Sequence, residues 1–361
     1  MWIFYPCESV FIRVQLSLLS LKYFSSEKSA FICVPWMERM RAFEVIQPGA
    51  FTTVQDLGRY GYQKYGVSIS GAMDRFALRV ANLLAGNDQG EAAVEATIIG
   101  PRLKALGKIR VAISGADLSP EIDGKPAPMW RTLDVPKGSI LSFGALKSGC
   151  RAYLAVSGGI DFPVVMGSRS IHTRSNLGGN GRALAKGDVL KIKESGIRIQ
   201  DSGTRIQESG TYQLPEDLVP VYGRQWKVRA IMGPQHDYFS RRGIETFLNG
   251  EYEITPQADR MGYRLKGPKI EHKGGPDILT DATPPGSVQV PGDGMPIILL
   301  ADGQTTGGYS KIATVASVDQ DLLAQARPGD KVRFQRITIT EAQRLLAEME
   351  KKIVELRRRL L

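Results

Sequence analysis

The sequence is poor in the residues that build metal centres and disulfide frameworks. Its 361 residues include three histidines and three cysteines, namely His172, His236, His272, Cys7, Cys33 and Cys150. No two histidines have H-x-x-x-H spacing and no two cysteines have C-x-x-C spacing, so we expect no bound metal and no disulfide network. Free thiols are typical of a reducing cytosol, and we expect a cytoplasmic protein.

A long apolar run is also missing. Residues 1–39 are apolar and aromatic and contain no glycine, but charges interrupt them at Glu8, Arg13, Lys22, Glu27 and Lys28. No stretch approaches the roughly 18 apolar residues of a spanning helix, and the order of a signal peptide is absent. We therefore expect no membrane contact, a native start at Met40 or Met37, and a segment 1–39 outside the fold. A tail that binds a partner is the alternative.

The sequence lacks a concentrated basic surface. The formal net charge is +10, but residues 336–361, with seven Lys/Arg against four Asp/Glu, supply only +3, and the rest is dispersed. Zinc-finger spacing and an aromatic RNA-binding strand are absent. We expect no nucleic-acid partner, and a surface compatible with an anionic substrate or partner.

Glycine, in contrast, is abundant, with 39 residues. Short apolar segments bounded by Gly, Pro, Asp or Asn predict the strands of a barrel or sandwich, at 111–114, 140–143, 151–156, 228–232 and 297–300. A turn followed by a strand recurs three times, starting at Pro136, Ala185 and Pro328, and in each copy a glycine supplies positive φ. The fold class we expect is therefore mainly β.

The pattern divides the chain into parts. We expect a lobe over 40–194, a linker over 195–223, a second lobe over 224–336 and a C-terminal helix over 337–361. The linker begins with a near-perfect duplication of seven residues within 195–210, which is polar and punctuated by glycine. This composition favours a flexible or hairpin-like connection.

Two helices are predicted. Residues 73–84 are apolar at helical spacing, with Asp74 near the positive end and Gly86 as the stop. Thr338 and Glu341 form a capping-box pattern ahead of the C-terminal helix. The apolar residues of that helix recur at spacings of four and three, at Ala342, Leu346, Met349, Ile353, Leu356 and Leu360. Such a seam packs either on the chain's own lobe or on a second chain.

Four clusters combine glycine with polar side chains that a barrel core would exclude, at 47–59, 70–74, 233–237 with 259–264, and 289–309. In the last cluster, the apolar segment 297–300 leads into Asp302 and the run Gln304-Thr-Thr-Gly-Gly. Backbone N–H groups of such a run can hold an anion or a developing oxyanion, although a simple hairpin bend is the alternative. Because P-loop and G-x-S-x-G motifs are absent, catalysis would depend on positioning groups and not on a covalent nucleophile.

Together these clusters resemble the allophanate-hydrolase-subunit-2 family, also called the biotin-dependent carboxyltransferase or KipA family. The resemblance covers 43–334 and includes PGAFTTVQDLGRYGYQKYGVSISGAMD, GCRAYLAVSGGID, MGSRS, GGNGRALAKGD, GPQHD, DRMGYRL and VQVPGDGMPIILLADGQTTGGY. It implies two cyclophilin-like β-barrel lobes, a few short helices and an active cleft between the lobes.

The resemblance also implies a function. For a chain of this size it points to a subunit of ATP-dependent 5-oxoprolinase, which opens the 5-oxo-L-proline lactam to L-glutamate. Subunits A and B would be the partners, with B in direct contact, and ATP would be bound by or shared with a partner. One alternative is a biotin-dependent carboxyltransferase acting on urea or a similar amide, the only case that needs biotin. Another is a regulatory protein that binds a kinase-inhibitor partner.

Residue type and loop context give the candidate roles. In either enzyme an amide or ureido oxygen gains negative charge, and N–H, hydroxyl and guanidinium groups would stabilise it. The candidate catalytic residues are Asp302, Arg264, Thr305 and Thr306. The candidate substrate-binding residues are Gln235, Gln289, Gly307, Gly308, Tyr309, Asp259, Arg59 and Asp56. Each could instead be a loop residue that satisfies neighbouring backbone.

Overall fold

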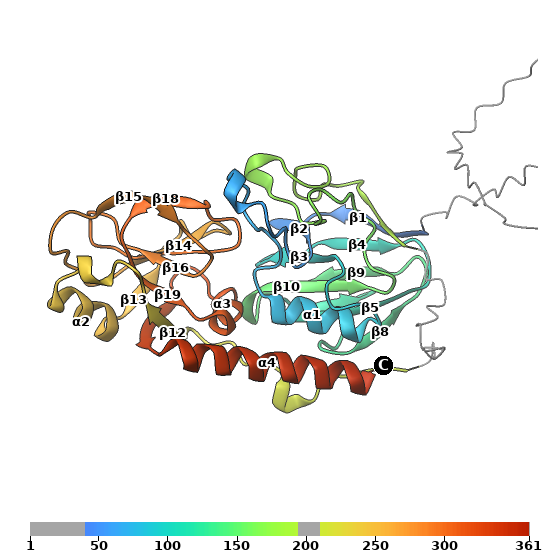
Figure 1. Cartoon of the computed structure of the whole chain (residues 1–361). Helices are drawn as coiled ribbons and strands as arrows, with labels where there is room; N and C mark the ends of the chain where they lie inside the picture. The colour runs from blue at the N-terminus through green and yellow to red at the C-terminus, as the bar shows by residue number, and fades with distance from the viewer. Residues whose placement is uncertain (1–39, 194–209, 361) are drawn as a thin grey trace, which may run out of the picture. The chain divides into compact units, whose positions relative to one another are not determined.

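The computed structural model describes residues 40–193 and 210–360. The predictions for segment 1–39 and for most of the 195–210 duplication lie outside the described residues. Strands dominate both lobes, and the long C-terminal helix lies beside them (Figure 1). The two lobes and this helix belong to one unit by their internal contacts.

The N-terminal lobe consists of two antiparallel sheets. The first has the order β11-β1-β4-β9-β6-β7 and the second β2-β3-β10-β5-β8. The bounds are β1 Met40–Gln47, β2 Phe51–Gln55, β3 Ala93–Thr97, β4 Arg102–Ala105, β5 Ile109–Asp117, β6 Pro120–Ile122, β7 Lys125–Pro126, β8 Thr132–Val135, β9 Ile140–Phe143, β10 Ser148–Val156 and β11 Val189–Ile192. Alternating apolar residues from both sheets, such as Phe43, Val45, Val111 and Leu154, form one buried cluster.

The C-terminal lobe is a closed seven-stranded barrel of order β12-β19-β16-β17-β14-β13-β20. Its strands are β12 Gln225–Met232, β13 Tyr252–Ile254, β14 Gly262–Lys266, β16 Ser287–Gln289, β17 Ile297–Leu299, β19 Lys311–Val315 and β20 Lys331–Arg336. A parallel ladder between β12 and β20 closes it. Phe247 stacks on Phe334 with ring centroids 4.3 Å apart, in a core that also holds Tyr252 and Tyr263.

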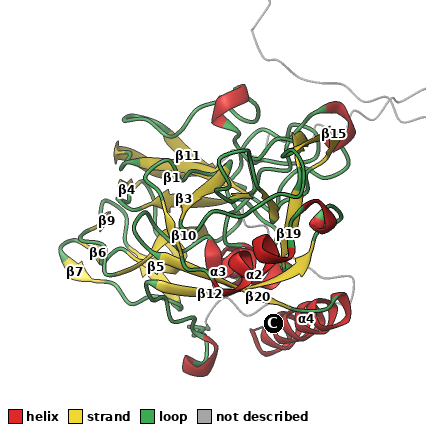
Figure 2. Cartoon of the chain, turned by 90° about the vertical axis from the view of Figure 1, so that its left-hand side faces the viewer, coloured by secondary structure: helices red, strands yellow, loops and turns green. Residues whose placement is uncertain are grey.

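The remaining elements connect and cover these sheets. They are α1 Arg75–Leu84, α2 Arg241–Asn249, α3 Ser317–Leu323, α4 Ile339–Leu360, the ribbon of β15 Asp277–Ala282 with β18 Thr306–Tyr309, and the short 3-10 turns η1 Gln63–Tyr65, η2 Thr173–Ser175, η3 Glu216–Leu218 and η4 His236–Tyr238. Figure 2 shows how much of the chain between the yellow strands is loop.

The predicted helix at 73–84 is confirmed as α1. Asp74 is its N-cap, and the Asp74 carboxylate accepts a hydrogen bond of 2.8 Å from the Ala77 N–H. Gly86, with φ of 79°, follows the last turn. Eight of the ten helix residues are buried, because β5 and β10 contact one side and α4 another.

The C-terminal helix is also confirmed as α4, and the structure shows which part of the chain it packs against. The Thr338 hydroxyl accepts from the Glu341 N–H at 3.2 Å, as the capping-box pattern predicts. Ile353, Leu356 and Leu360 are buried in the same cluster as α1, so the second half of the apolar seam packs on this chain's N-terminal lobe. In the first half, Leu346 is 37% exposed.

The mainly β prediction with a C-terminal helix is confirmed, with one refinement. The C-terminal lobe closes into a barrel, whereas the described part of the N-terminal lobe forms two sheets that share no ladder. Side-chain packing joins those sheets, and the segment after β10 adds backbone bonds to both, from the Ile160 N–H to the Ala92 carbonyl at 3.2 Å and from the Asp161 N–H to the Lys191 carbonyl at 2.8 Å. The three predicted turn glycines, Gly138, Gly187 and Gly329, all have positive φ (88°, 88° and 86°).

Candidate functional site

A cavity of about 380 Å³ lies against the barrel of the C-terminal lobe. Strand register places three of its lining residues side by side, because Arg264 on β14 and Gln289 on β16 both pair with Ile297 on β17. Tyr263 and Leu265 face the barrel core, so the alternation along β14 turns Arg264 outward. The lining residues are Arg174, Gln257, Asp259, Met261, Gly262, Arg264, Gln289, Ile297, Leu299, Gln304 and Tyr309.

Two linked primary amides form one wall of this cavity. Gln304 Nε2 donates to Gln289 Oε1 at 3.4 Å, and Gln289 Nε2 donates to the Tyr309 carbonyl at 3.3 Å. Gln289 is buried, whereas Gln304 is exposed. A Cβ atom on Gly307 would lie 2.6 Å from Gln289 Nε2, so a larger residue at position 307 would displace this amide from its present position.

The charged groups of the cavity differ in their pairing. Arg174 Nη2 donates to Asp259 Oδ2 at 2.6 Å, and this pair joins the two lobes at the rim. Its side chains are 64% and 40% exposed, so we expect it to contribute about 0–1 kcal/mol. Arg264 is exposed and, within the part of the chain that the structure describes, has no ion-pair partner. The Arg264 guanidinium is therefore available to an anionic ligand.

Asp302 lies outside this cavity. Its side chain is 7% exposed and accepts hydrogen bonds from Arg260 Nε at 2.8 Å and Arg260 Nη2 at 3.0 Å. The Ser70 hydroxyl of the other lobe donates to it at 2.8 Å. Both carboxylate oxygens of Asp302 are therefore occupied by hydrogen bonds within the chain. Asp302 can affect a bound ligand only indirectly, by fixing the position of the loop that leads to Gln304.

Arg260 links this carboxylate to the N-terminal lobe. Arg260 Nη1 donates to Glu95 Oε1, and Nη2 donates to the Gly71 carbonyl at 2.6 Å. Burial lowers the pKa of Arg260, but the neighbouring Asp302 and Glu95 carboxylates outweigh it and raise that pKa. The guanidinium therefore stays charged inside the lobe interface.

A second set of buried groups continues from Glu95. The Tyr153 hydroxyl donates to Glu95 Oε2 and accepts from the Asp74 N–H, both at 2.7 Å. Gln325 of the C-terminal lobe donates to Asp74 Oδ2 at 2.6 Å. Burial, followed by repulsion from Asp321, raises the pKa of Asp74 to about 7.

The structure brings some of the predicted site residues together. Arg264, Gln289, Tyr309 and Asp259 line the cavity, while Gly307 borders Gln289. Thr306, Gly307 and Gly308 belong to β18, which pairs with β15, so this run is a strand and not an open loop. The Thr305 carbonyl accepts from the Thr283 N–H at 3.0 Å.

Other predicted residues lie elsewhere. Gln235 braces the ribbon, because its amide donates to Asp281 at 3.2 Å and accepts from the Lys311 N–H at 3.2 Å. Asp56 is buried and accepts hydrogen bonds from the Ser168 and Ser170 hydroxyls and from the Gly58 and Arg169 N–H groups. Arg59 is completely buried beside Ser170. Gln235, Asp56 and Arg59 do not line the cavity.

Sequence reasoning missed Arg174, Gln257, Gln304 and Arg260. Arg174 comes from the η2 turn of the other lobe, 85 positions from Asp259 along the chain, and no local pattern reveals that approach. Gln304 stands within the glycine-rich cluster 289–309, yet its residue type alone did not predict a role. Arg260 and Arg264 lie in one motif, DRMGYRL, and only the start of β14 at Gly262 decides which of them faces inward.

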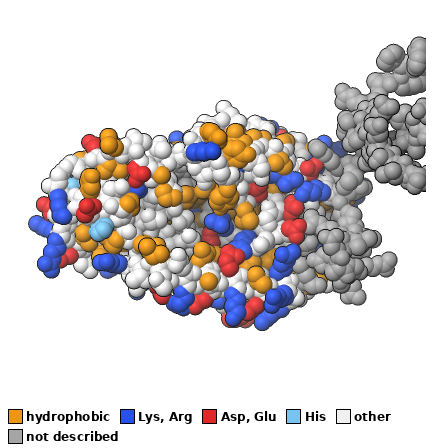
Figure 3. Space-filling model, viewed as in Figure 1, with side chains coloured by type: hydrophobic (Ala, Val, Ile, Leu, Met, Phe, Trp, Pro, Cys, Tyr) orange, Lys and Arg blue, Asp and Glu red, His pale blue; other side chains and the backbone are white. Residues whose placement is uncertain are grey.

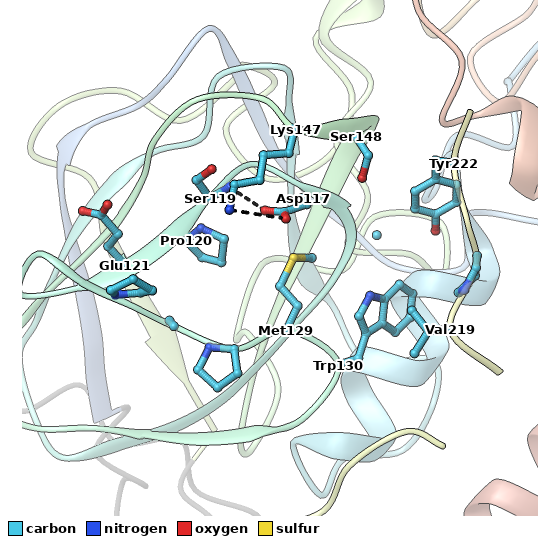
Figure 4. A pocket seen from close by; sticks show the side chains of 15 residues that line it. Asp117, Ser119, Pro120, Glu121, Met129, Trp130, Lys147, Ser148, Val219 and Tyr222 are labelled. Carbon is cyan, nitrogen blue, oxygen red and sulfur yellow. Dashed lines mark hydrogen bonds and ion pairs between the residues drawn. The ribbon is translucent and has the colours of Figure 1, made fainter. Parts of the chain in front are cut away.

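A larger cavity, of about 570 Å³, lies on the N-terminal lobe beside Trp130 and Tyr222 (Figure 4). Its charged groups are mainly paired with neighbours, since Asp117 accepts from the Ser119 N–H at 2.8 Å and lies 3.8 Å from Lys147 Nζ. It contains none of the predicted site residues. We therefore place the candidate site at the barrel cavity.

Three further observations concern metal binding, membrane-spanning helices and surface charge. In the described ranges, no three or more His, Cys, Asp or Glu side chains are grouped so that they could hold a metal ion. No helix among the described residues has both the length and the apolar character needed to cross a bilayer. On the face seen in Figure 3, acidic and basic side chains are interspersed.

Comparison with known proteins identifies the family. The model for "Carboxyltransferase domain, subdomain A and B" matches residues 65–336, which include the whole barrel and its cavity. The chain belongs to this carboxyltransferase-domain family. The architecture described above is also similar to part of a solved structure, since the crystal structure of the Kluyveromyces lactis urea amidolyase superposes with a TM-score of 0.80 at 32% identity, over 90% of this chain and 20% of that one.

Two curated relatives in the family are C subunits of 5-oxoprolinase. The one from Haemophilus influenzae is 34% identical over 316 residues, which cover 87% of this chain and 97% of the relative. The one from Escherichia coli is 36% identical over 308 residues, covering 83% and 92%. The chain thus spans nearly the full length of these two relatives and about a fifth of the urea amidolyase.

Proposed function

We propose that this chain is a subunit of an ATP-dependent 5-oxoprolinase, which opens 5-oxo-L-proline to L-glutamate. The observation that carries this proposal is the chemistry of the barrel cavity. It is lined by two linked amides, apolar side chains and the Arg264 guanidinium, which has no ion-pair partner within residues 40–193 and 210–360. These groups complement a small lactam that bears a carboxylate.

Each part of 5-oxoproline has a counterpart in the cavity. Arg264 pairs with the carboxylate, for which a planar guanidinium is well suited. A lactam amide is cis, so its N–H and C=O share one edge, and the exposed amide of Gln304 can pair with both. The ring methylenes pack on Ile297, Leu299 and Tyr309.

The position of the reacting bond sets the roles of the remaining groups. Charge that develops on the lactam oxygen is stabilised by the Gln304 and Gln289 amides, with Thr305 and Thr306 at the adjoining edge of the ribbon. Asp302 acts indirectly, because its bonds to Arg260 and Ser70 hold the loop that carries Gln304. Substrate orientation is thus the main contribution of this chain.

ATP and further subunits complete the proposal. A triphosphate needs several cationic or backbone donors, whereas the described lining of this cavity offers one guanidinium outside an ion pair. We therefore assign the nucleotide to a partner chain. The partners are 5-oxoprolinase subunits A and B, in keeping with the two bacterial relatives, which are named as the C subunit.

The test is co-expression of this chain with candidate A and B chains, followed by measurement of ATP-dependent glutamate release from 5-oxoproline. Arg264→Gln should raise KM for 5-oxoproline by about tenfold to a hundredfold, since a charge-assisted hydrogen bond contributes about 1.5–3 kcal/mol. Arg241→Gln is the matched control, because Arg241 is 94% exposed on α2. Absence of glutamate release with every partner combination would contradict the proposal.

A carboxyltransferase acting on urea is the second candidate, favoured by the similarity to the urea amidolyase structure. In that case biotin would be the carboxyl donor on a partner or further domain, and urea, which has no carboxylate, would not engage Arg264. Carboxylation of urea by the complex with a biotinylated carrier, unchanged in Arg264→Gln, would support this function over the first.

A further inference from the structure

The Arg59 guanidinium is buried in the N-terminal lobe with most of its hydrogen-bonding capacity unused. The side chain is 0% exposed. Nη2 donates to the Ser170 carbonyl, but Nε and Nη1 have no partner among the described residues. A guanidinium carries five N–H donors, and a buried cation whose donors are unpaired is strongly unfavourable. The Nε and Nη1 donors of Arg59 are therefore free to bind an acceptor that does not belong to the described part of the chain.

The nearest carboxylates do not pair with Arg59, because each has its own donors. Asp56 accepts from the Gly58 and Arg169 N–H groups and from the Ser168 and Ser170 hydroxyls. Asp302 is taken by Arg260 and Ser70. Burial lowers the pKa of Arg59, and Asp56 and Asp302 offset this only in part. The cation therefore lacks a direct counter-charge.

A glycine-rich loop lies directly against this guanidinium. A Cβ atom on Gly178 would be 3.0 Å from Arg59 Nη2, and Gly178, Gly179 and Gly181 all have positive φ. In the part of the chain that the structure describes, the N–H groups of Gly178, Gly179 and Asn180 donate to no acceptor. Successive free N–H groups in left-handed turns form anion-binding concavities.

We propose that Arg59 and the 177–181 loop form a binding site for a small oxyanion, of carboxylate, bicarbonate or phosphate type. The anion neutralises the guanidinium and accepts from its free N–H groups and from those of the loop. Gly178 is buried against Arg59, Gly179 is half-buried and Asn180 is exposed, so the loop runs from the guanidinium to the protein surface. The site is separate from the barrel cavity, whose lining does not include Arg59 or this loop.

Hydrogen–deuterium exchange of the unmodified chain is the primary test, because it needs no variant. Sodium acetate, bicarbonate and phosphate are each titrated at ionic strength matched with sodium chloride. We expect saturable slowing of exchange in the peptide that covers 177–184, absent with chloride. Protection by acetate and bicarbonate alone assigns a planar carboxylate-type anion, and protection by phosphate too assigns a general oxyanion site. No protection, or equal protection by chloride, overturns the proposal.

Variants then assign the effect to Arg59. Arg59→Gln should weaken the anion affinity at least tenfold, measured by the dependence of the melting temperature on anion concentration. Arg264→Gln should leave it unchanged, which separates this site from the proposed substrate cavity. An anion response that survives in Arg59→Gln would overturn the assignment, and if this variant does not fold, the exchange experiment decides alone.

Discussion

Arg260 holds both carboxylate oxygens of Asp302, through Nε at 2.8 Å and Nη2 at 3.0 Å, while its third nitrogen reaches Glu95 in the other lobe. All three side chains are nearly inaccessible to water. The buried Arg260 side chain therefore links the two segments that supply most of the cavity lining, 257–264 and 302–309. The lobe interface and the candidate site share this link.

The first prediction concerns this buried pair. Arg260→Gln should destabilise the chain by about 3–5 kcal/mol, because it leaves the Asp302 and Glu95 charges buried without compensation. Adding Asp302→Asn should recover part of the loss, since one uncompensated charge is then removed. Urea denaturation of the single and double variants measures both quantities, and strictly additive effects would contradict the coupling.

The second prediction concerns pH. Burial raises the pKa of Asp74 from 3.8 to about 7, and it raises that of Asp321 to about 6. Below about pH 4 both the folded and the unfolded chain hold these protons, and the contribution to stability is complete. As pH rises, the unfolded chain ionises first, so the free energy of unfolding should fall and level off above about pH 7.

Denaturation midpoints between about pH 4.5 and 8 check this dependence. Asp74→Asn should flatten the decline, because asparagine cannot ionise and is still a good N-cap. Asp123→Asn is the control, since Asp123 is an exposed carboxyl whose pKa is lowered, and it should leave the curve unchanged in this range. Parallel curves for wild type and Asp74→Asn would refute the assignment.

The third prediction tests the amide wall of the cavity. Gly307→Ala places a methyl group 2.6 Å from Gln289 Nε2 and should displace that amide, lowering 5-oxoproline affinity about tenfold or more. Gly308→Ala meets only the Ile278 carbonyl at 3.7 Å and should leave the affinity unchanged. Isothermal titration calorimetry compares 5-oxoproline binding by the two variants. Equal affinities would show that the Gln289 amide does not contribute to binding.

The fourth prediction concerns the C-terminal helix. Leu356→Ala should destabilise the chain by about 2–5 kcal/mol, because Leu356 is buried against the α1 cluster. Val354→Ala, at a position 46% exposed on the same helix, should cost far less. Thermal denaturation compares them. Similar losses for the two variants would show that α4 does not pack on the N-terminal lobe.

Local sequence determined the elements of this protein. The α1 helix with its Asp74 cap, the Thr338 cap of α4 and the positive-φ glycines at 138, 187 and 329 depend on neighbours within a few residues, so their signals are present in the chain itself. Once the structure sets the start of β14 at Gly262, strand alternation turns Arg264 away from Tyr263 and Leu265. Most of the residues that line the barrel cavity fall within the glycine-rich and polar clusters at 259–264 and 289–309.

Tertiary structure alone decided which polar groups meet. Asp302 is a buried partner of Arg260, Arg59 lies against Gly178, and Arg174 reaches Asp259 from the other lobe. Arg260 and Asp302 are 42 positions apart in the chain, and Arg174 and Asp259 are 85 positions apart. Contacts between residues far apart in the chain decide whether an Asp or Arg is exposed or paired, so residue type and local spacing cannot predict it.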